Sequence, residues 1–268
     1  MNTLPPTKRP VHIGALLAVT LVCGACSSSR MNGIAGPAAV DGAAAESVAN
    51  VTQEGKHLFI LSGQSNMVGL DPKTSFTPAV SKAFGEDKIL VVKDAHGGQS
   101  IRSWCKNNHE FPPATVGRVP KVRGLLYDSL MKKVQSAIED ETLQTITFVW
   151  MQGESDLRNT AYDLYLKELL QQLQDGLQFK DINLVIGRIS DCGLDVQKRL
   201  AGKKYIRKTQ AEFAESYPRG AWVDTDDLND RKQGDKIVHD LHYTAAGSQT
   251  LGERFAAAAI GLINDTDE

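Results

Sequence analysis

Three short polar stretches, each close behind an apolar run, contain the types of side chain that acyl transfer requires. They are Ser62-Gly-Gln-Ser-Asn66, Asp94-Ala-His-Gly-Gly98 and Gln152-Gly-Glu-Ser-Asp156. The first places Ser65 in a tight turn, where a hydroxyl can act as a nucleophile if an imidazole takes its proton. Ser65 is therefore the candidate nucleophile.

The chain also offers a base and two acids for this nucleophile. His242 lies just ahead of the last helical pattern and is the candidate base. A carboxylate must hold the imidazole in its orientation and balance its charge. Asp240, two residues before His242, and Glu154, in the third polar stretch, are both candidates for this role.

An oxyanion needs hydrogen-bond donors aimed at the point where its negative charge develops. The candidate donors are the Ser65 amide, the amide of Gly97 or Gly98, and the Gln152 side chain. Taken singly, each stretch also has an ordinary explanation, since a glycine pair is typical of a loop hinge and residues 152–156 are typical of a helix cap. No cluster of His, Asp and Glu has the spacing of a metal site, so no metal is expected.

Apolar patterning indicates which elements position these stretches. Runs typical of strands alternate about five times with stretches that have helical spacing. The expected strands cover residues 58–61, 89–92, 143–151, 182–189 and 221–223, and the expected helices cover residues 122–139, 161–174, 196–215 and 244–263. We expect a polar loop around Pro72 and Pro78. The alternation predicts βαβ units in a single domain, with a parallel sheet covered on both faces. The three polar stretches would then meet at the carboxyl edge of the sheet.

The amino terminus has the pattern of an export signal. Lys8 and Arg9 precede an uncharged run at residues 13–22, which is too short to span a bilayer. Gly24-Ala-Cys26 follows and resembles a bacterial lipoprotein cleavage box, in which the cysteine is lipidated. Ordinary signal-peptidase cleavage nearby is the alternative.

These features predict three parts of the chain, namely a lipoprotein-type signal peptide (1–25), a flexible tether rich in Ala, Ser and Gly (26–55) and a folded domain (56–268). The expected location is the periplasm or cell surface, with a lipid anchor at Cys26 in the membrane. Cys105 and Cys192 then remain as thiols that could pair, although the sequence does not show them within reach. The net charge of −2 without a basic cluster argues against a nucleic-acid partner, and no protein partner is evident.

Together, and in this order, the motifs resemble those of SGNH hydrolases of the carbohydrate acetylesterase branch. That branch includes sialate O-acetylesterase-like domains and carbohydrate esterase family six. The resemblance spans residue 56 to the last helix, and the matching residues are Gly63-Gln-Ser-Asn-Met67, Gly97-Gly98 with Ile101 and Trp104, Trp150-Met-Gln-Gly-Glu154, and His242 with Gly247.

The resemblance implies a three-layer αβα sandwich with a flavodoxin-like parallel five-stranded sheet. It also implies a serine esterase that removes acetyl groups from carbohydrates through an acyl-enzyme and needs no metal or organic cofactor. Ser65 would be the nucleophile and His242 the base, and Gly98 and Gln152 would complete the oxyanion hole beside the Ser65 amide.

One position departs from the family pattern. Many SGNH hydrolases carry an Asp three residues before the histidine, where this chain has His239. Some acetylesterases of this branch are thought to use the Glu of the Gln-Gly-Glu motif instead. Glu154 and Asp240 therefore both stay candidates for the acid.

The substrate is expected to be an acetylated polysaccharide or glycan. Arg102 and Trp104 follow the glycine pair and are candidate substrate contacts, because Trp faces often bind sugars, although packing is the alternative. A catalytically silent glycan-binding lipoprotein with the same fold is one rival function. A flavodoxin-like cofactor binder is another, but the turn around Ser65 offers little that would cradle a phosphate.

Overall fold

Five parallel strands form the centre of the protein and pair in the order β2-β1-β3-β4-β5. The computed structural model describes residues 55–107 and 120–265. The strands are β1 (Lys56–Gly63), β2 (Ile89–Ala95), β3 (Leu143–Met151), β4 (Asn183–Gly187) and β5 (Gly220–Val223). The three middle strands, β1, β3 and β4, are buried over most of their length, which explains their nearly continuous apolar sequences. The predicted flavodoxin-like parallel sheet is confirmed.

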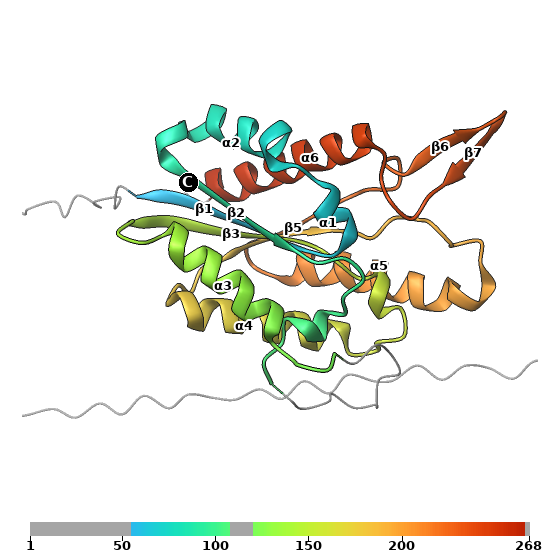
Figure 1. Ribbon diagram of the computed structural model, residues 1–268, viewed down its shortest axis with the longest axis horizontal. Helices are drawn as coiled ribbons and strands as arrows, with labels where there is room; N and C mark the ends of the chain where they lie inside the picture. Colours follow the sequence, from blue (N-terminus) through green and yellow to red (C-terminus); the bar gives the residue numbers. More distant parts are fainter. Residues whose placement is uncertain (1–54, 108–119, 266–268) are drawn as a thin grey trace, which may run out of the picture. The chain divides into compact units, whose positions relative to one another are not determined.

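Helices cover both faces of this sheet (Figure 1). On one face lie α1 (Ser65–Gly69), α2 (Phe76–Phe84) and α6 (Ala245–Asn264), and on the other lie α3 (Leu125–Ala137), α4 (Tyr162–Leu177) and α5 (Gln197–Ser216). Short 3-10 turns occur at η1 (Pro72–Thr74), η2 (Glu86–Lys88), η3 (Ile101–Ser103) and η4 (Glu154–Asp156). The apolar stripe of each long helix packs on the sheet, as in α4, where Leu166, Leu169 and Leu173 are buried.

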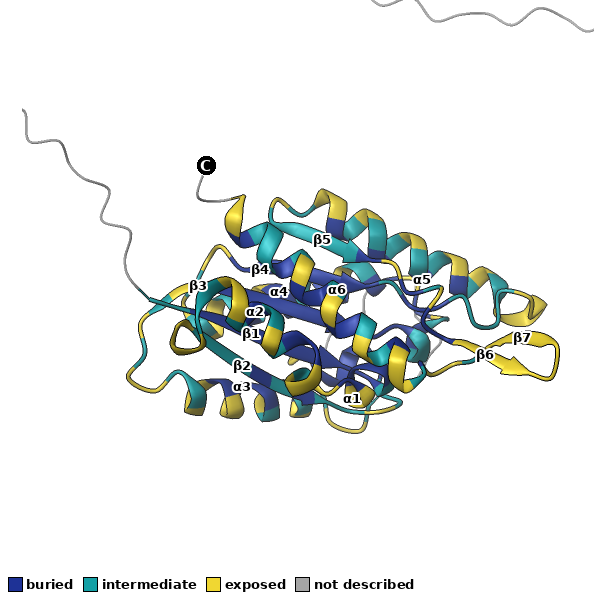
Figure 2. Ribbon diagram, turned by 90° about the horizontal axis from the view of Figure 1, so that it is seen from above, coloured by how far each residue is buried: buried dark blue, intermediate teal, exposed yellow. Residues whose placement is uncertain are grey.

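Two elements differ from the sequence-based expectation. The expected polar loop around Pro72 and Pro78 contains α2, whose Phe76 and Val80 are buried. Pro78 is the third residue of this helix, in the first turn, where backbone N–H groups have no acceptor within the helix, so a proline is tolerated. The second element is an exposed antiparallel hairpin of β6 (Asp230–Gln233) and β7 (Lys236–His239), which projects from the sheet (Figure 2) and was not predicted.

The polar stretches come together because their strands are neighbours in register. Gly63, the last residue of β1, pairs with Ala95 of β2 on one side and with Met151 of β3 on the other. Gly63 has a φ of 142°, and a Cβ there would lie 2.0 Å from the carbonyl oxygen of Met151, so only glycine fits. The predicted convergence at the carboxyl edge of the sheet is confirmed.

The expected signal peptide, Cys26 and nearly all of the tether lie outside the described residues and stay predictions. Within the described ranges, no helix is both long enough and apolar enough to cross a membrane.

Candidate active site

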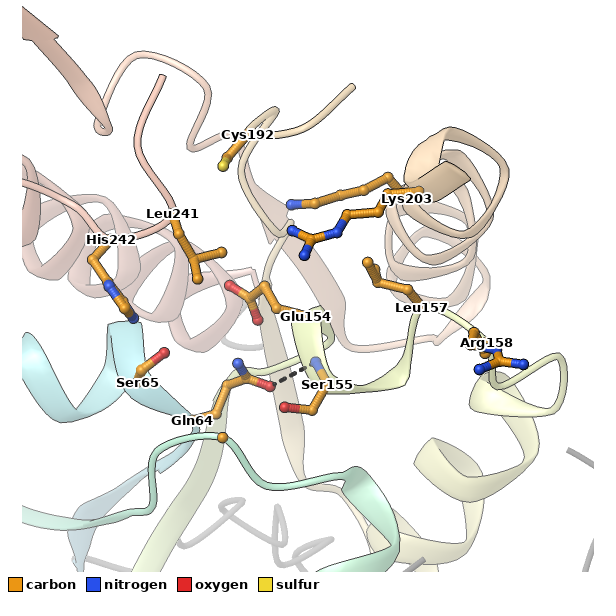
Figure 3. A pocket seen from close by; sticks show the side chains of 12 residues that line it. Gln64, Ser65, Glu154, Ser155, Leu157, Arg158, Cys192, Lys203, Leu241 and His242 are labelled. Carbon is orange, nitrogen blue, oxygen red and sulfur yellow. Dashed lines mark hydrogen bonds between the residues drawn. The ribbon is translucent and has the colours of Figure 1, made fainter. Parts of the chain in front are cut away.

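An open cavity of about 720 Å³ lies at the carboxyl edge of the sheet (Figure 3). Of the predicted site residues, it brings together Ser65, Gly98, Glu154 and His242. Its full lining comprises Gln64, Ser65, Gly98, Glu154, Ser155, Leu157, Arg158, Cys192, Arg199, Lys203, Leu241 and His242. The candidate nucleophile, base and one candidate acid therefore share one cavity.

Ser65 and His242 face each other across this cavity. Ser65 is the first residue of α1, and the turn before it is held by a hydrogen bond from the Gln64 amide to the Met151 carbonyl oxygen (2.8 Å). His242 is exposed on the segment between β7 and α6, and Figure 3 shows its imidazole pointing toward the Ser65 side chain. This arrangement suits proton transfer from the hydroxyl to the imidazole.

The buried side chain of Asn66 connects the backbone around the candidate base to one of the candidate acids. Its Nδ2 donates to Glu154 Oε1 (3.1 Å) and to the Leu241 carbonyl oxygen (3.2 Å). Its Oδ1 accepts from the Tyr243 amide (3.3 Å). Asn66 therefore holds the residues on both sides of His242 and also the Glu154 carboxylate. Asn66 was assigned no role of its own from the sequence. Its position next to Ser65 was the only sequence signal that pointed to one.

The negative charge of Glu154 is disfavoured by burial and favoured by neighbouring groups. Its Oε2 is buried without a hydrogen-bond partner in the described structure. Burial raises the pKa of Glu154, while the nearby Lys203 charge, the Asn66 hydrogen bond and the His242 charge all favour the ionised form. Lys203 is itself buried and donates to the Ser190 carbonyl oxygen (2.9 Å). Sequence reasoning missed Lys203, which carries no motif.

Asp240, the other candidate acid, has different partners. Its Oδ1 accepts from the Leu241 amide (2.6 Å), and its Oδ2 pairs with Arg231 of the hairpin (3.1 Å). Asp240 does not line the cavity. Of the two carboxylates, only Glu154 lines the cavity together with His242.

Gly98 and Gln152, the expected oxyanion donors besides the Ser65 amide, are placed differently from each other. Gly98 lines the cavity and has a φ of 66°. Gln152 is fully buried behind the cavity wall. Its Nε2 donates to Asp156 Oδ2 (2.6 Å), to the Gln99 carbonyl oxygen (3.0 Å) and to Gln64 Oε1 (3.2 Å). The Gln152 amide nitrogen is thus directed at acceptors inside the protein.

Asp156 links the loops after β2 and β3. Besides Gln152, it accepts from Ser100 Oγ (2.7 Å), the Ile101 amide (2.9 Å) and Asn159 Nδ2 (3.1 Å). Burial raises the pKa of Asp156, and these donors favour its charged form. Sequence reasoning assigned it no role, although it ends the third polar stretch.

The expected substrate contacts of Arg102 and Trp104 need a correction. Both side chains are 0% exposed. Arg102 lies 5.3 Å from the centre of the Tyr165 ring, and Trp104 packs edge-to-face on Trp150 at 5.0 Å between ring centres. Neither side chain lines the cavity, so the structure does not place them at a substrate bound there.

The described residues contain neither a disulfide nor a candidate metal site. Cys105 is buried and Cys192 lines the cavity, and both are free thiols, so the possible disulfide is not formed. Across residues 55–107 and 120–265, no group of three or more His, Cys, Asp or Glu side chains is arranged to hold a metal ion.

A family model described as "Carbohydrate esterase, sialic acid-specific acetylesterase" matches residues 67–261. Among solved structures, a protein from Arabidopsis thaliana is similar at 19% identity and a TM-score of 0.57, over 77% of this chain and 98% of that one. A carbohydrate acetylesterase from Xanthomonas citri is similar at 15% identity and a TM-score of 0.55, over 78% of this chain and 56% of that one. NanS is similar at 10% identity and a TM-score of 0.52, over 79% of this chain and 98% of that one. At these identities the structures support the fold. No curated protein gave a significant match.

Proposed function

Because the chain belongs to the family of sialic acid-specific acetylesterases among the carbohydrate esterases, it is a carboxylic ester hydrolase that deacetylates carbohydrates, and we propose that Ser65 is its nucleophile. The observation that carries the proposal is the single cavity that holds Ser65, His242 and Glu154. It supplies a nucleophile, a base and an acid to the same substrate.

In the proposed first step, His242 takes the proton from Ser65 Oγ as this oxygen attacks the acetyl carbonyl carbon. The backbone amides of Ser65 and Gly98 stabilise the negative charge on the carbonyl oxygen. Gln152, the third expected donor, is buried with its Nε2 directed at acceptors inside the protein, so we give it no direct contact with this oxygen. The tetrahedral intermediate collapses when His242 gives its proton to the departing sugar oxygen, which leaves an acetyl group on Ser65.

In the second step, His242 removes a proton from a water molecule, which attacks the acetyl-enzyme. Collapse of the second tetrahedral intermediate returns the proton to Ser65 Oγ and releases acetate. We assign Glu154 as the acid that orients His242 and balances the imidazolium charge. We assign Asp240 a structural role instead, because it contacts the Leu241 amide and Arg231 and so holds the segment that precedes His242.

The charges around the cavity favour an acidic sugar as substrate. Arg158, Arg199 and Lys203 line it, whereas Glu154 is its only carboxylate among the described residues. A positively charged lining attracts and orients a carboxylate on the sugar. This preference agrees with the description of the family.

We also propose that the enzyme is exported and anchored to a membrane through a lipid on Cys26. The basis is the sequence alone, in which a positively charged start and a short apolar run precede Gly24-Ala-Cys26. Metabolic labelling with a radioactive fatty acid tests the anchor, because Cys26→Ser should abolish the label.

The central test combines covalent labelling with product release. A fluorophosphonate probe should label the wild type on Ser65 and leave Ser65→Ala unlabelled. Acetate release from 4-nitrophenyl acetate and from O-acetylated sialic acid should fall by several orders of magnitude in Ser65→Ala, because nucleophile and base act as a unit. Near-normal turnover by Ser65→Ala would show that another residue is the nucleophile.

A further inference from the structure

The side-chain amide of Gln64 is held so that its oxygen faces the protein. Gln64 Oε1 accepts from Gln152 Nε2 (3.2 Å), from the Ser155 amide (3.3 Å; dashed in Figure 3) and from the Gly153 amide (3.5 Å). All three partners are donors, so only the oxygen of the Gln64 amide fits at this position. The nitrogen must therefore lie on the opposite side.

That nitrogen is an unused donor at the cavity wall. Gln64 lines the cavity although only 3% of the residue is exposed, and its Nε2 has no hydrogen-bond partner in the described structure. Figure 3 shows it directed into the cavity between Ser65 and Glu154. Because Gln64 Nε2 faces an open cavity, a ligand oxygen bound there can accept a hydrogen bond from it.

We propose that Gln64 Nε2 donates to the carbonyl oxygen of the bound ester and strengthens this bond as the oxygen becomes negative, an inference that rests on Ser65 as the nucleophile. Gln152 then is a positioning residue, which fixes the Gln64 amide from behind. Asp156 in turn holds Gln152, because Asp156 Oδ2 accepts a hydrogen bond from Gln152 Nε2 (2.6 Å). A neutral amide suits this task because it donates to an oxyanion without giving up its proton.

The carbonyl oxygen is the substrate atom that this geometry favours. Gln64 directly precedes Ser65, and its backbone amide is bonded to the Met151 carbonyl oxygen, so its side chain is held relative to the nucleophile. The acyl group is the part of any substrate that must lie against Ser65. The departing sugar oxygen, in contrast, must lie near His242 to receive its proton.

The test uses the full-length protein with Gln64→Met and Gln64→Glu. Gln64→Met removes the donor, and Gln64→Glu keeps an oxygen for the three inner donors but replaces the nitrogen by an acceptor. With 4-nitrophenyl acetate, both should lower kcat about 10²–10³-fold with little change in KM, the loss typical of one oxyanion donor. Binding of an aryl boronic acid, which forms a tetrahedral adduct with serine, should weaken in both.

The matched control is Gln249→Met on the exposed surface of α6, which should keep wild-type kinetics. An aryl acetate carries no sugar, so a Gln64 that contacted only the sugar would leave its hydrolysis unchanged. Near-wild-type kcat with this substrate in Gln64→Met would overturn the inference. A wild type that is neither labelled on Ser65 nor active would instead overturn the proposed function.

The positioning role of Gln152 is tested with Gln152→Met alone and combined with Gln64→Met. If Gln152 acts through Gln64, the double variant should lose no more kcat than Gln64→Met, because the mediator is already absent. Multiplied losses would show that Gln152 donates to the substrate directly and would overturn this part. If the double variant does not fold, Gln152→Met alone provides the test. A positioning role predicts that this variant has both a lower kcat and a weaker affinity for the boronic acid. A lower kcat with unchanged affinity for the boronic acid would overturn the positioning role.

Discussion

Asn66 Nδ2 donates to Glu154 Oε1 over 3.1 Å, so the residue that follows the proposed nucleophile holds the proposed acid. The same amide group binds the backbone on both sides of His242. One buried side chain, next to Ser65 in α1, thus contacts the Glu154 carboxylate and the backbone around His242, which are the other two proposed catalytic groups.

The first prediction concerns this link. Asn66→Asp keeps the acceptor for the Tyr243 amide but loses both donors and places a second carboxylate beside Glu154. We expect kcat to fall at least about 10²-fold, because displacement of the base and acid disturbs the reacting geometry. Stopped assays with 4-nitrophenyl acetate measure the effect, and Asn66→Ala, which adds no charge, should lose less. Wild-type kcat in Asn66→Asp would contradict the role of Asn66.

The second prediction separates the two acids. Glu154→Gln removes the charge beside His242 but keeps the oxygen that accepts from Asn66, and should lower kcat about 10²–10⁴-fold. Asp240→Asn loses an exposed pair with Arg231 and should change kcat little. Initial-rate kinetics of both variants decide the assignment. The reverse order of effects would identify Asp240 as the acid.

The third prediction is a pH dependence of stability. Burial raises the pKa of Glu154 in the folded state, so its ionised form costs stability above that pKa and this cost disappears as pH falls. Glu154→Gln should therefore raise Tm relative to the wild type at pH 8. The difference should shrink toward pH 4, near the ordinary pKa of about 4.3 for glutamate. Thermal unfolding measures it across this range.

The control for this experiment is Glu253→Gln on the exposed surface of α6, which reports the effect of the amide substitution itself. A Tm difference for Glu154→Gln that stays constant from pH 4 to pH 8 would contradict a raised pKa.

The fourth prediction concerns the substrate. Arg199→Gln should raise KM for O-acetylated sialic acid about 5- to 50-fold, the effect of losing one charge-assisted contact, and leave KM for 4-nitrophenyl acetate unchanged. Arg254→Gln, which pairs with Asp227 and does not line the cavity, is the matched control. An equal rise in KM for both substrates would argue against recognition of the sugar carboxylate.

The sequence allowed most of the sheet to be predicted, because buried parallel strands leave continuous apolar runs such as that of β3. The helix α2 escaped prediction because Pro72 and Pro78 are typical of loops, and proline in a first turn is compatible with both structures. The meeting of Ser65, Gly98 and the 152–156 stretch followed from strand order, whereas strand order did not place His242, which lies between the hairpin and α6. Side-chain direction did not follow, since Gln64 and Gln152 are the same residue type at two strand ends and only their hydrogen bonds distinguish them. Trp104 was misplaced for a similar reason, because an aromatic side chain after a strand packs inward or binds a ligand with the same sequence pattern.

The contacts of Asn66 also determine when activity can appear during folding. Its side chain bonds to atoms 88 and 175 residues further along the chain. Closing loops of this length costs conformational entropy that local contacts do not repay, so such contacts form late. Recovery of esterase activity after dilution from denaturant should therefore lag behind recovery of helical circular dichroism, and the lag measures how long the chain is folded locally but catalytically incomplete.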